Sequence, residues 1–391
     1  MSTLNPDSEA VYLDYNATTP PDPAVLETMF FVLREVFGNP SSQSHRWGRA
    51  AQDCVEAARG QTAALIDASP SEIVFTSGAT ESCNLAIKGA AAAYRDKGSH
   101  IIASMAEHKA VLEPLKQLAN SEIDITLLRP DRNGRITAEQ VQQAIGPHTI
   151  LVCVMAANNV LGTVNPIAEI ADVCKKRGVL LFCDATQAVG KIPFSVEHSG
   201  VDLAALSAHK MYGPKGVDVL YVRSRGPRVR LTPQILGGGQ ERGLRGGTQN
   251  VPGIVGMGKA CELAARQQMH DATYMRRLRD RFEDGLAAAV EGVEVAARFA
   301  ERLPNTSLIV FPRIRAEQML RRLADTVAAS TGSACDSAAG QSNYVLKAIG
   351  MEQDKIAGAV RFSIGRFTTD LQIDFAVKAI GQTVRGLNER R

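Results

Sequence analysis

Short apolar runs alternate with helix-patterned stretches through the middle of the chain, and this alternation limits the possible folds more than any other feature. The runs that we interpret as strands are residues 73–75, 101–103, 150–154, 179–182 and 217–222. Between them, apolar residues recur at helical spacing in segments such as 81–97, 110–119 and 167–177. Strand–helix–strand repetition predicts an α/β fold with a mostly parallel sheet that helices cover on both faces.

The pattern changes after residue 262, and this change predicts a second domain. A long Arg-rich amphipathic stretch over residues 262–290 is followed by short strand candidates and further helical segments. A chain of 391 residues has room for two domains of ordinary size. We expect a large domain over residues 12–262 and a smaller α+β domain over residues 263–391, completed by residues 1–11.

Charge and composition exclude several classes of protein. Lys and Arg number 44 against 41 Asp and Glu, and a balance of +3 gives no reason to expect nucleic acid or a membrane surface as the main partner. No apolar run approaches the roughly 18 residues of a membrane span, and the start of the chain lacks the pattern of a secretory signal. The 7 cysteines include no CxxC motif, which disfavours a disulfide framework and a zinc site. We expect a cytoplasmic protein without a bound metal.

Polar, chemically capable residues follow two of the predicted strands. The sequence Thr-Ser-Gly-Ala-Thr-Glu occupies residues 76–81, and Asp-Ala-Thr-Gln occupies residues 184–187. In open α/β sheets, ligands bind outside the carboxyl ends of the strands. The sequence therefore predicts the active site at this edge of the sheet.

A lysine near this edge suggests a particular kind of cofactor. Lys210 lies in Ser-Ala-His-Lys, shortly after a further apolar strand. It can form a Schiff base with an aldehyde cofactor when its amine is desolvated, although alone it also fits a surface lysine. Asp184 suits the ring nitrogen of pyridoxal 5′-phosphate (PLP), but it equally suits a helix N-cap. Thr80 and the backbone beside Gly78 can bind a phosphate. His108 can act as a general acid or base above the ring, or be structural.

Four further motifs narrow the interpretation. They are Tyr-Leu-Asp-Tyr-Asn-Ala-Thr-Thr at 12–19, Gly-Asn-Pro-Ser-Ser at 38–42, Arg-Gly-Gly-Thr-Gln-Asn-Val at 245–251 and Ser-Thr-Gly-Ser-Ala-Cys at 330–335. Together with the motifs above, they resemble class V aminotransferase-type PLP enzymes of fold type I, and within these the cysteine desulfurases of the NifS/IscS group. The resemblance covers nearly the whole chain. It implies a seven-stranded sheet in the large domain, bound PLP, L-cysteine as substrate, a homodimer and a sulfur-acceptor protein.

The resemblance also implies a role for each motif residue. Lys210 would bind PLP covalently, Asp184 would pair with the ring nitrogen, and Gln187 would hydrogen-bond the ring hydroxyl. His108 would stack on the ring and move protons. The phosphate would be held by Ala79, Thr80, Ser207, His209 and, from the second subunit, Thr248. The substrate would be bound by Asn159, Arg361 and Asn16, because an arginine fork matches a carboxylate.

Cys335 decides which reaction the resemblance implies. It lies in a small-residue segment that we expect to form an exposed loop, where its thiolate would attack the substrate sulfur and carry a persulfide. It is also a candidate transient iron–sulfur ligand. The other cysteines lie in predicted strands and helices, where we expect them to pack as small hydrophobic residues. Asp336 departs from the family pattern, in which Ser or Thr commonly follows, and should raise the pKa of the thiol.

The implied function is a cysteine desulfurase that supplies iron–sulfur cluster assembly, tRNA thiolation or DNA phosphorothioation. The alternatives are a selenocysteine lyase, a related aminotransferase and an interaction protein that lacks PLP. An aminotransferase has no use for Cys335, and an interaction protein has no use for Lys210, Asp184 and His108. An arginine cluster at residues 223–230, without matching acids, is a candidate docking surface for the sulfur acceptor.

Overall fold

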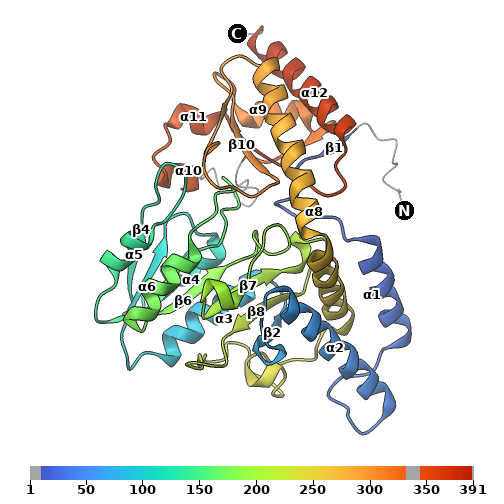
Figure 1. The fold of residues 1–391 in the computed structure, drawn as a ribbon, viewed down its shortest axis with the longest axis vertical. Coiled ribbons are helices and arrows are strands. Elements are labelled where there is room, and N and C mark those ends of the chain that lie inside the picture. Colours follow the sequence, from blue (N-terminus) through green and yellow to red (C-terminus); the bar gives the residue numbers. More distant parts are fainter. Residues whose placement is uncertain (1–9, 332–343, 390–391) are drawn as a thin grey trace.

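The computed structural model describes residues 10–331 and 344–389, which form a lower and an upper part along the long axis of the molecule (Figure 1). The lower part is built on a seven-stranded sheet with the strand order β2-β8-β7-β6-β5-β3-β4. Its strands are β2 (Ile73–Thr76), β3 (His100–Ser104), β4 (Asp124–Leu128), β5 (Thr149–Cys153), β6 (Leu180–Asp184), β7 (Leu203–Ser207) and β8 (Asp218–Val222). From β4 to β7 neighbouring strands pair in parallel, whereas β8 runs antiparallel to both β7 and β2. The predicted α/β fold with a mostly parallel sheet is confirmed.

Helices cover both faces of this sheet. They are α1 (Pro23–Glu35), α2 (Arg46–Leu65), α3 (Ala79–Ala93), α4 (Lys109–Ala119), α5 (Ala138–Ala144), α6 (Ile167–Arg177) and α7 (Val196–Ser199), with short 3-10 turns η1 (Pro70–Glu72), η2 (Ala208–Lys210) and η3 (Glu241–Gly243). Alternate strand residues enter different cores: Leu181 and Cys183 lie with residues of α2 and α6, and Phe182 with residues of α3 and α4. Because both faces are covered, the central strands are apolar at nearly every position.

A single long helix, α8 (Val251–Ala289), runs from the lower part into the upper part (Figure 1). It begins earlier than the amphipathic pattern predicts, because Pro252 stands in the first turn, where its missing N–H is not needed. The side chain of Asn250 caps this end by accepting the Gly253 N–H at 3.2 Å. The expected domain boundary between residues 262 and 263 therefore lies within a continuous helix.

The upper part combines small sheets with helices. Its elements are β1 (Val11–Tyr12), β9 (Glu294–Val295), β10 (Thr306–Val310), β11 (Val327–Ala328), β12 (Ala359–Ser363), α9 (Ala316–Leu323), α10 (Tyr344–Ala348), α11 (Gln353–Ala357) and α12 (Asp370–Asn388). The antiparallel sheet has the order β12-β10-β9, and β1 pairs in parallel with β11. Phe282 of α8 packs edge-on against Phe362 of β12, with ring centroids 5.0 Å apart, in the core of this part. The division into residues 12–262 and 263–391, with 1–11, stays a prediction.

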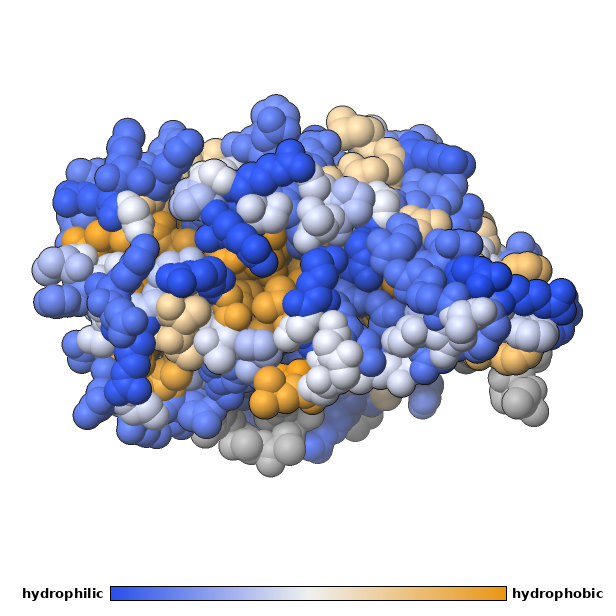
Figure 2. Space-filling view, turned by 90° about the horizontal axis from the view of Figure 1, so that it is seen from below, coloured by the Kyte–Doolittle hydropathy of each residue, from blue (hydrophilic) through white to orange (hydrophobic). Residues whose placement is uncertain are grey.

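The face seen from below is mostly hydrophilic, with hydrophobic residues between the polar ones on its left half and near its middle (Figure 2). Within residues 10–331 and 344–389, no helix is both long enough and apolar enough to cross a membrane.

Candidate active site

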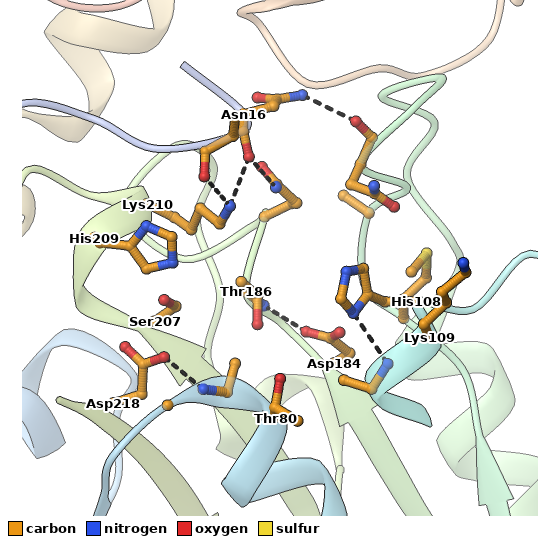
Figure 3. Close-up of a pocket in the computed structure, with 18 of the residues that line it drawn as sticks. Asn16, Thr80, His108, Lys109, Asp184, Thr186, Ser207, His209, Lys210 and Asp218 are labelled. Atoms are coloured by element: carbon orange, nitrogen blue, oxygen red, sulfur yellow. Dashed lines mark hydrogen bonds between the residues drawn. The ribbon is translucent and has the colours of Figure 1, made fainter. Parts of the chain in front are cut away.

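A cavity of about 440 Å³ lies beyond the carboxyl ends of β6 and β7, where the sequence predicts the site. It brings together nearly all of the residues that the motifs singled out (Figure 3). The predicted site residues that line it are Asn16, Ala79, Thr80, His108, Asn159, Asp184, Gln187, Ser207, His209, Lys210 and Arg361. Loops and element ends from distant parts of the sequence therefore converge on one space.

Lys210 enters the cavity from η2, the tight turn that follows β7. Its Nζ donates to the carbonyl oxygens of Asn16, at 2.7 Å, and Ala17, at 2.5 Å. The N-terminal segment before α1 thus lies directly over the lysine, and this contact holds the amine inside the cavity (Figure 3). An amine held among backbone carbonyls is positioned for chemistry on a ligand rather than extended into solvent.

Asp184 and His108 line the same cavity, one from the end of strand β6 and the other from the start of helix α4. Asp184 ends β6, is buried, and accepts the N–H of Thr186 at 3.0 Å. His108 is the N-cap of α4, and its Nδ1 accepts the N–H of Ala110 at 3.1 Å. This bond requires the ring proton of a neutral His108 to lie on Nε2, the other ring nitrogen. The adjacent Glu107 is fully buried, accepts the N–H of Met155 at 2.8 Å, and has its pKa raised well above the usual range by burial.

A polar cup forms where α3 begins beside β7 and η2. Thr80 stands in the first turn of α3, and His209 lies opposite it in η2 (Figure 3). Burial, together with the charges of Lys210 and Lys215, lowers the pKa of His209 to about 4. His209 is therefore neutral at pH 7, and its Nδ1 lies 3.1 Å from Thr18 Oγ1. The cup suits an anion because the N-terminal N–H groups of a helix carry partial positive charge.

Arg361 of β12 forms the opposite end of the cavity. Its Nη1 donates to the Asn159 carbonyl at 3.1 Å and its Nη2 to Asp14 Oδ1 at 2.7 Å. Among the described residues, Arg361 Nε and Asn159 Oδ1 are buried without any hydrogen-bond partner. Buried polar atoms are nearly always paired, so these two atoms point to a polar ligand at this end.

Asn16 joins the two parts of the molecule beside the cavity. Its Nδ2 donates to Thr306 Oγ1 at 2.8 Å, and its Oδ1 accepts from Asn305 Nδ2 at 3.1 Å. Its carbonyl oxygen also accepts from Gln187 Nε2 at 3.0 Å. Asn16 is thus fixed by the upper part and by the lower part together, and it carries the contact to Lys210.

Two predicted site residues are not placed in this cavity. Thr248 lies in an exposed segment between η3 and α8 and does not line the cavity of its own chain. Cys335, with its neighbour Asp336, lies outside the described residues.

Sequence reasoning missed two buried charged side chains beside the cavity. Asp218 lines the cup and begins β8, where the sequence shows only one polar residue in an apolar run. Lys191 is buried behind Gln187, to whose Oε1 it donates at 2.6 Å. Its spacing of four residues from Gln187 is a weak signal that could have drawn attention to the pair.

The six described cysteines carry free thiols, as expected for packing residues. Burial raises the pKa of each of them, to about 12 for Cys174 and Cys261. A thiol that resists ionisation is a poor nucleophile, so none of these six is suited to attack a substrate at neutral pH.

Comparisons with known proteins agree with this geometry. The aminotransferase class-V family model matches residues 11–375. Cysteine desulfurase IscS of Anaeromyxobacter dehalogenans strain 2CP-C is 48% identical over 379 residues, covering 97% of this chain and 93% of the relative. A solved NifS-like protein superposes with a TM-score of 0.90 at 39% identity, covering 96% of this chain and 100% of that chain. The solved structure of SspA in complex with cysteine superposes with a TM-score of 0.80 at 36% identity, covering 92% of this chain and 100% of that chain. The chain belongs to the class V aminotransferase family and, within it, to the cysteine desulfurases.

Proposed function

We propose that this cysteine desulfurase uses PLP to convert L-cysteine to L-alanine and passes the sulfur, held as a persulfide on Cys335, to an acceptor protein. The observation that carries the proposal is the convergence of Lys210 and Asp184 on one cavity, at the ends of the neighbouring strands β7 and β6. A reactive amine and a buried carboxylate facing the same space are the two groups that PLP chemistry needs from a protein.

The cavity residues fit PLP. Thr186 Oγ1 is buried without a hydrogen-bond partner among the described residues, as are the two atoms at the Arg361 end. Lys210 would hold the cofactor covalently, Asp184 its ring nitrogen, Gln187 its ring hydroxyl and His108 its ring face. Ala79, Thr80, Ser207 and His209 would hold its phosphate. When bound, PLP supplies an electron sink for the bonds around the substrate Cα.

Arg361 would bind the substrate carboxylate. Its guanidinium is buried and is already held in one orientation by hydrogen bonds to Asp14 and to the Asn159 carbonyl. Binding of a carboxylate therefore costs little rotational freedom of the arginine side chain. Asn159 Oδ1 and the Asn16 side chain border the same end, where they would contact the remaining polar groups of L-cysteine. These groups would hold the carboxylate of the amino acid at the Arg361 end of the cavity.

The protons would be moved by Lys210 Nζ and His108. Cys335 Sγ would form an S–S bond with the substrate sulfur as the substrate C–S bond breaks. The C–S electron pair stays with the three-carbon remainder, which takes up a proton and leaves as L-alanine. The products are therefore one persulfide and one L-alanine for each L-cysteine.

A homodimer is part of the proposal, with Thr248 reaching the partner's phosphate site. Large apolar side chains are exposed along and just after α1, including Phe30 at 66%, Phe31 at 55% and Phe37 at 73%. Leu236, in the segment before η3, is 82% exposed. Several exposed large apolar side chains along one helix, as on α1, are typical of a protein–protein interface.

The arginine cluster at residues 223–230 supports a sulfur acceptor with an acidic surface. Arg223 is paired with Asp202, whereas Arg225, Arg228 and Arg230 are exposed and take part in no ion pair among the residues described. Arg230 also lies over the Tyr94 ring, with its guanidinium carbon 5.8 Å from the ring centroid.

Iron–sulfur assembly, tRNA thiolation and DNA phosphorothioation are the acceptor pathways we propose. The cytoplasm as the compartment is supported by the free thiols.

The test is the product balance with free L-cysteine. Incubation with L-cysteine and a thiol reductant should release L-alanine and sulfide in equal amounts, and borohydride treatment should abolish both. A selenocysteine lyase would instead turn over selenocysteine and leave L-cysteine intact. An aminotransferase would form a keto acid without sulfide. Either of these outcomes would overturn the proposal.

A further inference from the structure

A carboxylate already occupies the polar cup at the start of α3. Asp218 Oδ2 accepts the Ala79 N–H at 2.5 Å (Figure 3). Asp218 Oδ1 accepts the Ala208 N–H at 2.7 Å. The side chain is 3% exposed. It reaches the cup because Asp218 stands opposite Ser207 of β7 and Thr76 of β2 in the sheet. The N–H group at the first residue of α3, which suits a phosphate, is thus bonded to a side chain of the chain itself.

A phosphate and an ionised carboxylate cannot share such a cup without a large cost. Both are anions, both accept hydrogen bonds, and the space is shielded from water, which strengthens their repulsion. A protonated carboxyl, by contrast, has an O–H that can donate to a phosphate oxygen. Protonation would also weaken its hold on the Ala79 N–H, which the phosphate could then accept.

The groups near Asp218 that can carry charge lie in η2, in the segment after it, in α3 and at the end of β6. Lys210 of η2 and Lys215 line the cavity, while His209 is neutral at pH 7. On α3, Glu81 is engaged with Arg245 and Ser77, and the buried Cys83 resists ionisation. Asp184 lines the far side of the same cavity.

Burial raises the pKa of Asp218 to about 6, although the N–H groups of Ala208 and Ala79, the Ser207 hydroxyl and the charge of Lys210 oppose this change. Free Asp218 is therefore mostly ionised at pH 7, and a further rise of its pKa by about one to two pH units would protonate it. A phosphate dianion in the cup would raise this pKa further.

We propose that Asp218 is a further binding residue, whose carboxyl takes up one proton from solvent when the cofactor's phosphate enters the cup. This inference rests on the proposed PLP site. It predicts that the affinity for PLP falls with rising pH more steeply than the affinity for pyridoxal, which has no phosphate. Over the range in which free Asp218 is ionised, the ratio of the two affinities should fall about tenfold per pH unit.

The test is calorimetric titration of the full-length protein, stripped of cofactor, with PLP and separately with pyridoxal. Measurements at about pH 7.5, in two buffers of different ionisation enthalpy, count the protons exchanged. PLP should take up one proton more than pyridoxal, because contributions from the aldehyde end cancel in the difference. Equal proton uptake for the two ligands would overturn the inference.

Two variants identify the group that takes up the proton. In Asp218→Asn the extra proton should disappear, whereas in Thr80→Ala it should remain while PLP binds more weakly. An extra proton that persists in Asp218→Asn would place it on the phosphate and overturn the inference. A protein that binds neither PLP nor pyridoxal would instead overturn the proposed cofactor, and this inference with it. Equal proton uptake of PLP and pyridoxal by the wild-type protein already overturns the inference, so poor folding of a variant does not leave it beyond test.

Discussion

Lys191 Nζ donates a hydrogen bond of 2.6 Å to Gln187 Oε1, and both side chains are buried. Gln187 Nε2 in turn donates to the Asn16 carbonyl, which also accepts from Lys210 Nζ. The lysine therefore fixes which end of the Gln187 amide faces the cavity. A chain of hydrogen bonds connects a buried amine outside the cavity with the amine inside it.

Replacing Lys191 should disturb the proposed cofactor, although Lys191 is not among the residues that line the cavity. In Lys191→Met, Gln187 Oε1 loses its donor, at a cost of about 1–3 kcal/mol. We expect a shifted absorbance maximum of the bound cofactor and an affinity for PLP reduced by roughly 5- to 150-fold. Spectrophotometric titration measures both. Lys176→Met, at an exposed position of α6, is the control, and identical spectra for the two variants would rule out this positioning role.

Arg361 should govern binding of the substrate carboxylate. Arg361→Lys keeps a positive charge but loses the planar fork, so kcat/KM for L-cysteine should fall by roughly 10- to 150-fold, equivalent to about 1.5–3 kcal/mol. The loss should come mainly from KM, while the cofactor absorbance stays unchanged. Steady-state kinetics with L-cysteine checks this, and an unchanged KM would remove Arg361 from the substrate site.

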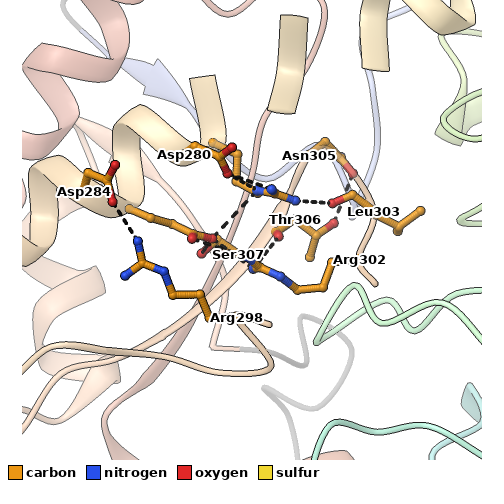
Figure 4. A network of polar contacts seen from close by, with 10 residues as sticks. Asp280, Asp284, Arg298, Arg302, Leu303, Asn305, Thr306 and Ser307 are labelled. Atoms are coloured by element: carbon orange, nitrogen blue, oxygen red, sulfur yellow. Dashed lines mark hydrogen bonds and ion pairs between the residues drawn. The ribbon is translucent and has the colours of Figure 1, made fainter. Parts of the chain in front are cut away.

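A buried ion pair joins α8 to the segment at the start of β10, whose residues Asn305 and Thr306 hydrogen-bond to the Asn16 side chain. Glu283 pairs with Arg302 at 2.9 Å and accepts from Ser307 Oγ at 2.8 Å, and all three residues are buried (Figure 4). Glu283→Ala leaves Arg302 as an unpaired buried charge and should lower the free energy of unfolding by about 3–5 kcal/mol.

The neighbouring exposed pair provides the control for this prediction. Arg298 Nη2 lies 2.7 Å from Asp284 Oδ1, and the side chains of Asp284 and Arg298 are 70% and 43% exposed (Figure 4). Asp284→Ala should therefore cost at most about 1 kcal/mol. Denaturant unfolding of both variants tests the comparison, and equal losses of stability would show that burial does not set the cost.

The exposed aromatic residues of α1 should mediate self-association. Phe30→Asp combined with Phe31→Asp places two charges on this helix and should convert the proposed dimer to monomers. Because Thr248 would then no longer reach a partner, PLP should also bind more weakly. Leu371→Asp, at an 81% exposed position of α12, is the matched control. Sedimentation analysis of the variants measures their oligomeric state, and a double variant that stays dimeric would argue against this surface as the interface.

The sequence predicts the central sheet well because its strands are buried on both faces and are therefore apolar throughout. It did not reveal β4, an edge strand whose residues are mostly part-exposed and mixed in character. It also did not reveal β12, where the polar Arg361 interrupts the apolar pattern. Both strands take their conformation from pairing with distant segments rather than from local pattern.

The candidate site shows the same division. Motifs at strand ends predict Lys210, Asp184 and Thr80 in one place, and the structure brings them together. Asp218 was missed because its partner Ala79 lies 139 residues away in the sequence. Lys191 was missed because its importance comes from burial behind Gln187, which residue type alone does not indicate.

The central claim is that Cys335 receives the substrate sulfur, and the most direct measurement is peptide mass spectrometry after a brief incubation with L-cysteine and no reductant. The peptide that contains Cys335 should gain the mass of one sulfur atom in the wild-type protein and in the control Cys54→Ser. It should gain none in Lys210→Ala, and Cys335→Ser should release neither sulfide nor L-alanine from L-cysteine. A Cys335→Ser protein with full sulfide release, or sulfur found on another cysteine, would contradict the account.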